Sequence, residues 1–252
     1  MTEQRGRAES EREHHDRVAP DYDRYYVDSL HYRLLHAEFL EDVTACFAPG
    51  EGVLADIGAG TGAMAVPLHQ RGYDVVAVDN SPGMLAQLSA KAPGIRTLVA
   101  DACRPLPFAD GSVGCVVINE TLHHLKGHDA ILREVRRILH PLGKLCICEP
   151  QLLPRGLDFI RRIARRNLNP LGHTPDEQPI DPGRLKKLLK QNGYTVLRKG
   201  TTFFLPFDPK FRPARWFIRT FWRVPGRIPL IRRLGGVFKV CVEKSEPGGP
   251  AA

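Results

Sequence analysis

Short apolar runs alternate with helix-like apolar patterns through the first 150 residues of the chain. The strand-like runs cover residues 52–57, 74–78, 95–100, 113–119 and 144–149. Between them, apolar residues recur at helical spacing and predict helices over about 63–70, 82–91 and 130–139. This alternation is typical of a parallel sheet with helices on both faces. Before it, residues 22–47 also follow a helical period, which ends at Pro49-Gly50.

The rhythm changes after residue 149. A basic amphipathic helix is expected over 157–167. A better-marked helix over 181–191 has Asp181 as its N-cap, Pro182 at its first position and Asn192-Gly193 as its terminator. Residues 194–199 and 237–243 read as two further strands. The chain therefore extends beyond a simple strand–helix alternation.

Composition bounds the class of protein. The 252 residues suffice for one well-buried α/β domain, and no apolar run approaches the roughly 20 residues that span a bilayer. The first 17 residues are charged, without the apolar stretch of a secretory signal, and we expect a disordered tail there and a cytoplasmic protein. Six cysteines include no C-x-x-C pair, so we expect reduced thiols and no metal site.

The net charge of +8 is unevenly distributed. Residues 151–244 hold 21 Lys and Arg against 6 Asp and Glu, whereas the rest of the chain holds 15 against 22. The positive charge thus belongs to the carboxyl-terminal third, where it could face an anionic or membrane-bound partner.

A glycine-rich turn follows the first strand of the alternation. Gly58, Gly60 and Gly62 let the backbone turn tightly and approach a ligand, and the next helix offers its N-terminal N–H groups. The spacing G-x-G-x-G differs from the G-x-G-x-x-G of dinucleotide sites. Asp56 precedes the glycines and suits an ammonium or ribose group better than a pyrophosphate.

Two more carboxylates close the next strands. Asp79 can accept hydrogen bonds from ribose hydroxyls, and Asp101 can accept one from an adenine amino group. Because the carboxyl ends of parallel strands meet at one edge of the sheet, Asp56, Asp79 and Asp101 are expected at one ligand-binding edge.

Taken together, these motifs resemble the class I S-adenosylmethionine-dependent methyltransferases of the UbiE/methyltransferase-11 type. The matching segments span roughly residues 18–150 in consistent order, namely VAPDYD at 18–23, the segment 54–62, VAVDNSPGML at 76–85, VADACRPLPF at 99–108, VVINETLHHL at 116–125 and the segment 131–149. One departure is Pro141-Leu142-Gly143, where the family usually has Pro-Gly-Gly.

The resemblance implies a Rossmann-like, mostly parallel seven-stranded sheet with helices on both faces and an antiparallel last strand. It divides a single domain over 18–252 into a cofactor-binding core (18–150), acceptor-side elements (151–236) and a final strand (237–244). It also implies S-adenosylmethionine as cofactor, held by Tyr22, Asp56, Gly58, Ala59, Gly60, Gly62, Asp79, Asn80, Asp101, Ala102, Asn119 and Glu120.

The catalytic groups are less well marked. The methyl donor is already reactive, so the main task is alignment, and a base is needed only if the acceptor must lose a proton. His124, with His123 as the second candidate, is the predicted base, although either could cap or pack the segment after strand four. Glu149 could face the acceptor or cap the next segment.

The acceptor is expected to be a small, apolar or lipid-linked molecule. Residues 157–166 and 214–233 place arginines opposite apolar side chains, which suits peripheral membrane contact but equally a helical cover with a solvated face. A tRNA or protein methyltransferase, an inactive cofactor-binding partner subunit and a nicotinamide-dependent reductase remain alternatives. Nucleic acid is disfavoured because no recognised RNA module is present. The oligomeric state is not indicated.

Overall fold

A computed structural model describes residues 2–27, 29–152, 179–202, 216 and 236–245. Its elements in chain order are α1 (Thr2–Tyr26), α2 (Leu30–Thr44), β1 (Val53–Ile57), α3 (Ala65–His69), β2 (Asp74–Asp79), α4 (Pro82–Lys91), β3 (Arg96–Val99), β4 (Val113–Asn119), the 3₁₀ helix η1 (Leu122–His124), α5 (His128–Ile138), β5 (Leu139–Pro150), α7 (Pro182–Gln191), β6 (Tyr194–Thr202) and β7 (Val237–Lys244). The predicted segments 157–166 and 214–233 lie, apart from Trp216, outside the described residues.

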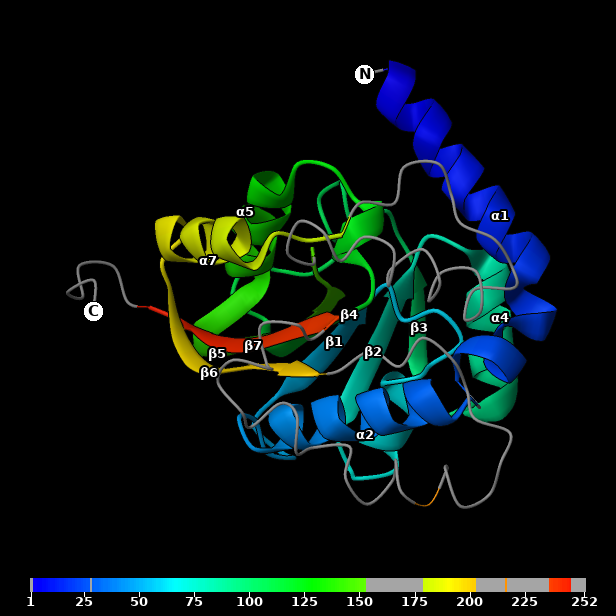
Figure 1. The fold of residues 1–252 in the computed structure, drawn as a ribbon, viewed down its shortest axis with the longest axis horizontal. Coiled ribbons are helices and arrows are strands. Elements are labelled where there is room, and N and C mark those ends of the chain that lie inside the picture. The colour runs from blue at the N-terminus through cyan, green and yellow to red at the C-terminus, as the bar shows by residue number, and fades with distance from the viewer. Residues whose placement is uncertain (1, 28, 153–178, 203–215, 217–235, 246–252) are drawn as a thin grey trace.

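One seven-stranded sheet, of order β3-β2-β1-β4-β5-β7-β6, organises the fold (Figure 1). The strands β1 to β5 pair in parallel, whereas β7 runs antiparallel to both β5 and β6. The predicted Rossmann-like sheet with an antiparallel last strand is therefore confirmed. Among the described residues, no helix is long and apolar enough to cross a membrane.

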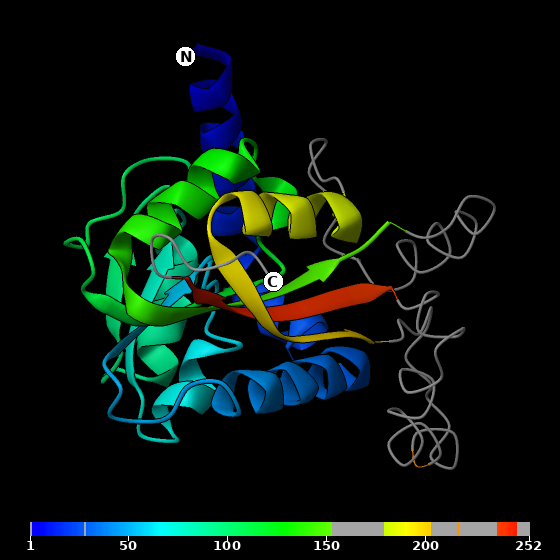
Figure 2. The ribbon, with the colours of Figure 1, turned by 90° about the vertical axis from the view of Figure 1, so that its left-hand side faces the viewer.

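Two apolar layers cover the two faces of this sheet. On one face, α2, α3 and α4 contribute side chains such as Phe39, Leu68 and Leu88; on the other, α5 and α7 contribute Leu132 and Leu189. Figure 2 shows α2 below the sheet and α5 with α7 above it. Burial on both faces explains why the central strands are continuous apolar runs without alternation.

The strand β5 begins earlier than expected, at Leu139. Its pairing with β4 shifts register between Val113 and Cys115, which accommodates the Pro141-Leu142-Gly143 segment. Leu142 adopts φ +62°, the left-handed conformation that glycine reaches without steric cost. The departure from Pro-Gly-Gly thus places a side chain at a left-handed position of β5 that does not line the pocket described below.

The N-terminal residues differ from the expectation of a disordered tail over 1–17. They belong to α1, which runs beside α4 (Figure 1). The Asp16 carboxylate accepts hydrogen bonds from Ser81 Oγ (2.6 Å) and Gly83 N (2.8 Å) at the start of α4. A Cβ on Gly83 would lie 2.9 Å from Asp16 Oδ1, so the glycine permits this close approach. Charge pattern alone could not reveal a helix held by such a tertiary contact.

Candidate functional site: a pocket at the carboxyl edge of the sheet

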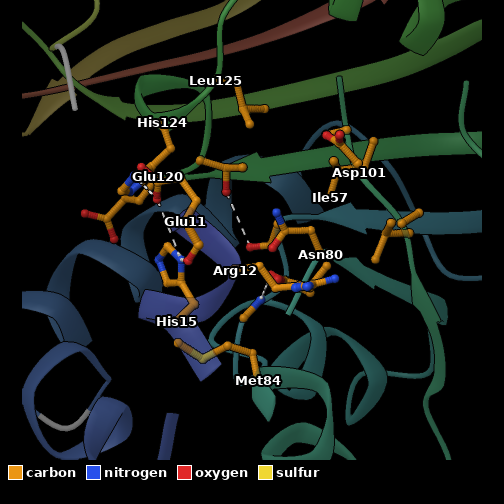
Figure 3. A pocket seen from close by; sticks show the side chains of 18 of the residues that line it. Glu11, Arg12, His15, Ile57, Asn80, Met84, Asp101, Glu120, His124 and Leu125 are labelled. Atoms are coloured by element: carbon orange, nitrogen blue, oxygen red, sulfur yellow. Dashed lines mark hydrogen bonds and ion pairs between the residues drawn. The ribbon is translucent and has the colours of Figure 1, made fainter. Parts of the chain in front are cut away.

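A pocket of about 980 Å³ opens where β1, β2 and β4 end. Most predicted site residues line it: Tyr22, Gly58, Ala59, Gly60, Asp79, Asn80, Asp101, Ala102, Asn119, Glu120 and His124. In Figure 3, Glu11, His15, Glu120 and His124 gather on one side, and Asn80 and Asp101 lie on the other. We call these the acceptor side and the donor side.

The glycine loop forms the floor of the donor side. Gly58 and Gly60 have φ of +75° and +52°, and the N–H groups of Gly58 and Ala59 donate to Val78 O at 2.8 and 3.0 Å. A Cβ on Gly58 would lie 2.2 Å from Thr121 Oγ1. The loop therefore needs glycine here both for its backbone conformation and for its contact with the segment after β4.

Asp79 fastens this loop to the end of β2. Its Oδ2 accepts from Gly60 N at 2.8 Å, and its Oδ1 accepts from Ser81 N at 2.9 Å. Burial raises the pKa of Asp79, against the lowering effect of these backbone donors. Each carboxylate oxygen can accept a further hydrogen bond, so Asp79 can hold the loop and a ribose hydroxyl together.

Asp56 and Gly62, although predicted to bind cofactor, do not line the pocket. Asp56 is 1% exposed beneath the loop, where it accepts a hydrogen bond from the backbone N–H of Ala65. Burial raises its pKa to about 7. Gly62 (φ +95°) faces Val66 and Leu88 instead: a Cβ on Gly62 would lie 2.9 Å from Val66 Cγ2 and 3.1 Å from Leu88 Cγ. Both residues therefore shape the loop from behind.

Two features of the pocket fit the predicted cofactor. Asn119 Oδ1 is buried and has no hydrogen-bond partner within the described part of the chain, which suits a ligand ammonium group. Val99, 61% exposed, lines the same pocket and offers an apolar surface to a flat base. Beside it, Asp101 accepts from Cys103 N (2.8 Å) and lies 3.4 Å from Arg104 Nε.

The two predicted catalytic histidines have different positions. His123 Nδ1 lies 2.8 Å from Glu149 Oε2 and is absent from the pocket lining. Glu149 is fully buried and also accepts from Thr121 N (2.8 Å) and Leu122 N (2.6 Å). Glu149 thus fixes the turn after β4, with His123 attached. His124 faces the pocket and stays the predicted base of the two.

The helix α1 closes the acceptor side. His124 Nδ1 lies 3.4 Å from Glu11 Oε2, and its ring contacts that of His15 at a centroid distance of 5.5 Å. Further along α1, Tyr22 stacks on Tyr26 at 4.7 Å. Asp23 joins the glycine loop to α4, because its Oδ1 accepts from Thr61 and its Oδ2 from Lys91, both at 2.5 Å.

Sequence reasoning missed His36. Its Nε2 lies 3.2 Å from Glu120 Oε2, across 84 positions of sequence, and both side chains line the pocket. Helical periodicity placed residue 36 in a helix, but no local motif marks it. Only the placing of α2 against the sheet brings the pair together.

Comparison with known proteins identifies the central part of the chain. Residues 55–147 match the family described as "Methyltransferase domain". This segment is a methyltransferase domain. Demethylmenaquinone methyltransferase of Beutenbergia cavernae is 42% identical over 101 residues, 40% of this chain and 41% of that protein. Its counterpart in Mycolicibacterium paratuberculosis is 41% identical over 134 residues, 51% and 56% of the two chains. The chain thus spans about half the length of these curated relatives.

Solved structures extend the likeness of the methyltransferase domain to the whole fold. Magnesium protoporphyrin IX methyltransferase from Synechocystis, with bound SAH, gives a TM-score of 0.65 at 16% identity and covers 95% of this chain and 100% of that one. An S-adenosylmethionine-dependent methyltransferase from Thermotoga maritima gives 0.63 at 19%, covering 92% and 99%. The predicted fold is confirmed, and the predicted resemblance to methyltransferases is confirmed over residues 55–147.

Proposed function

We propose that the protein transfers a methyl group from S-adenosylmethionine to a lipid-linked aromatic acceptor of the quinol class. The observation that carries this proposal is the glycine loop fastened by Asp79 inside a methyltransferase domain. The choice of acceptor is supported by relatives named demethylmenaquinone methyltransferases. These relatives align with only about half of this chain, so the alignment alone is a limited guide to the acceptor. We therefore infer the acceptor class from the relatives and the acceptor side of the pocket together.

The donor side would hold the cofactor through few side chains. Asp79 would accept from the ribose hydroxyls, Asp101 and Ala102 would border the adenine, and Asn119 would accept from the ammonium group. When bound, the cofactor supplies a methyl group on a positively charged sulfur, which is displaced in line. The chain's own task is to align the acceptor and exclude water, which can lower a barrier by about 7–11 kcal/mol.

The pocket has room for more than the donor. Its volume of about 980 Å³ lies near the upper end of the 300–1,000 Å³ typical of small-molecule sites. Tyr22 and Tyr26 add two contacting aromatic rings to the lining of the pocket, which favours a flat, apolar ring over a polar nucleophile.

Transfer of labelled methyl groups tests the proposal. Purified protein is mixed with methyl-labelled S-adenosylmethionine and demethylmenaquinol in detergent micelles, with Asp79→Ala as the inactive control. We expect labelled quinol with the wild type and almost none with the variant. If the wild type binds S-adenosylhomocysteine but labels no quinol, the acceptor assignment is overturned. If it binds neither, the methyltransferase activity itself is overturned.

Peripheral membrane contact through residues 157–166 and 214–233 is a separate part of this proposal. It rests on the arrangement of arginines in the sequence, since these segments, apart from Trp216, lie outside the described residues. Basic amphipathic segments bind anionic membrane surfaces. Flotation with anionic vesicles should recruit the wild type more strongly than Arg215→Glu/Arg219→Glu/Arg223→Glu, and equal recruitment would contradict this contact.

A further inference from the structure

A carboxylate–imidazole pair stands on the acceptor side of the pocket. Glu120 Oε2 lies 3.2 Å from His36 Nε2. The two side chains come from the end of β4 and from α2, and both line the pocket together with Tyr22 and Tyr26. With His36 8% exposed overall, the pair is largely shielded from bulk water. A shielded pair beside the ligand space can act on a proton there.

Glu120 is held in a conformation that its residue type disfavours. Its φ is +52°, and among the described non-glycine residues only Leu142 shares a positive φ. Its N–H donates to Cys148 O at 2.7 Å, which fixes the backbone. Such positions cost on the order of 1–3 kcal/mol and gather at functional sites. Glycine would adopt the turn without strain, but only a side chain at this position can reach His36.

The contact with Glu120 decides which nitrogen of His36 is available. A carboxylate favours the tautomer in which Nε2 carries the proton and donates it, so the lone pair is left on Nδ1. Tyr32 fixes the ring further, at a centroid distance of 5.8 Å. Among the described residues, the titratable groups that interact with His36 include Glu120, Tyr32 and His31. Burial and, secondly, His36 lower the pKa of His31 to about 3, so His31 stays neutral.

The other imidazoles in the pocket are tied to α1. His15 Nδ1 lies 2.8 Å from Glu11 O, and His124 Nδ1 lies 3.4 Å from Glu11 Oε2. His36 and Glu120 instead join α2 to the sheet itself. The pair is therefore held by two packed elements and does not depend on the position of the N-terminal helix.

We propose that His36 is a catalytic base for an aromatic hydroxyl of the acceptor, and that Glu120 is its positioning residue. This inference rests on the proposed function, in that the acceptor is taken to be a quinol. It adds to the two histidines after β4 a base that comes from α2. The substrate class follows from the chemistry, since an imidazole can remove a proton from a phenol-type hydroxyl but not from an unactivated ring carbon.

The step balances as follows. The hydroxyl proton moves to His36 Nδ1, and the electron pair of the oxygen is shared with the neighbouring ring carbon. That carbon forms its bond to the methyl carbon while the bond from methyl to sulfur breaks, leaving a neutral thioether. The proton displaced from the ring carbon leaves to water, and the imidazolium returns its proton to the oxygen. One proton is released for each methyl group transferred.

Binding of 1-naphthol in the presence of S-adenosylhomocysteine tests the base without requiring turnover. Naphtholate has its own absorbance, so ionisation of the bound hydroxyl can be followed directly. We expect wild type to ionise bound naphthol at a pH at least about one unit below that of free naphthol, which is a ~10-fold shift in the equilibrium. His36→Gln should abolish the shift, and Glu120→Gln should reduce it. His140→Gln, a change at an exposed histidine near the start of β5, should leave it intact.

Kinetics provide the second arm. His36→Gln should lower kcat by roughly 10²–10⁴-fold, with affinity for S-adenosylhomocysteine unchanged and partial rescue by added imidazole. Retained affinity also shows that each variant folds. The proposal is overturned if the wild type does not bind naphthol or does not shift the pH at which it ionises. It is also overturned if that shift persists in His36→Gln. A shift in a protein that methylates no quinol supports the base and overturns only the quinol acceptor.

Discussion

The donor side and the acceptor side of one pocket are built in different ways. On the donor side, Gly60 in the loop after β1 and Asp79 at the end of β2 are 19 positions apart and meet through a backbone N–H. On the acceptor side, His36 and Glu120 are 84 positions apart and meet through side chains. A contiguous motif thus positions the donor, whereas tertiary packing assembles the acceptor site. Changes on the acceptor side can alter the reaction without removing cofactor binding. Changes on the donor side should weaken cofactor binding and therefore the reaction as well.

The largest effect is expected from Asp79→Ala. It removes the acceptor of the Gly60 and Ser81 N–H groups together with the expected ribose contact. Hydrogen bonds to charged groups contribute about 1.5–3 kcal/mol each, so calorimetry should show a loss of S-adenosylhomocysteine affinity on the order of 100-fold. Asp74→Ala, on the same strand but exposed and paired with Arg96, is the matched control and should bind normally. Equal effects of the two changes would show that Asp79 has no special role.

Gly58→Ala tests whether close contact with Thr121 prevents the glycine loop from accepting a side chain at residue 58. The new Cβ would lie 2.2 Å from Thr121 Oγ1 and would also require φ +75°. Gly72→Ala has the same backbone problem (φ +86°) but meets no atom within 4 Å. Left-handed backbone costs about 1–2 kcal/mol and overpacking a further 1–3 kcal/mol. Urea denaturation should therefore show the larger destabilisation at Gly58, and similar values would contradict the close contact.

Asp56, buried beneath the glycine loop, should make the free energy of unfolding depend on pH. Burial raises its folded-state pKa from 3.8 to about 7, so the native protein favours the protonated form. Its contribution to stability is complete below pH 4 and is lost as the pH rises towards 7. The free energy of unfolding of Asp56→Asn minus that of wild type should therefore increase by a few kcal/mol between pH 4 and pH 8. A flat difference would mean that Asp56 is ionised throughout.

Much of the donor side could be predicted from the sequence because its determinants are local. Apolar runs predict its strands. Local signals also work away from the pocket, where Asp181 is confirmed as the N-cap of α7 and accepts from the Gly183 and Arg184 N–H groups. The burial of Asp56 beneath the glycine loop could not be predicted, because the position of a residue at a strand end does not determine which way its side chain faces. His36 could not be found because its partner lies on another element. The docking of α1 through Asp16 was hidden for the same reason.

Asp16→Ala is expected to loosen the acceptor side alone. It removes the contacts of α1 with Ser81 Oγ and Gly83 N, which together are worth about 1–3 kcal/mol. Hydrogen exchange of amides in residues 9–20 should become faster by about 10-fold, with little change in exchange at the glycine loop. Asp21→Ala, at an exposed position of the same helix, is the control. Faster exchange in both regions would show that the two sides are not independent.

The smallest effect is expected from a comparison of the two non-glycine residues with positive φ, Leu142 and Glu120. Leu142→Gly should stabilise the protein by roughly 0.5–1 kcal/mol, because the relief of a left-handed side chain exceeds the added freedom of the unfolded chain, and Leu142 is 53% exposed, so little burial is lost. Its kinetics should not change. Glu120→Gly removes the same kind of strain, φ +52°, but it also takes the carboxylate away from His36, which costs about 1–3 kcal/mol. Urea denaturation should therefore show no net gain, and kcat should fall, though less than in His36→Gln. If Glu120→Gly keeps full activity, the strain at Glu120 has no functional purpose, like the strain at Leu142 in β5. If instead only Glu120→Gly loses activity, the free energy held at residue 120 serves to keep a carboxylate against His36.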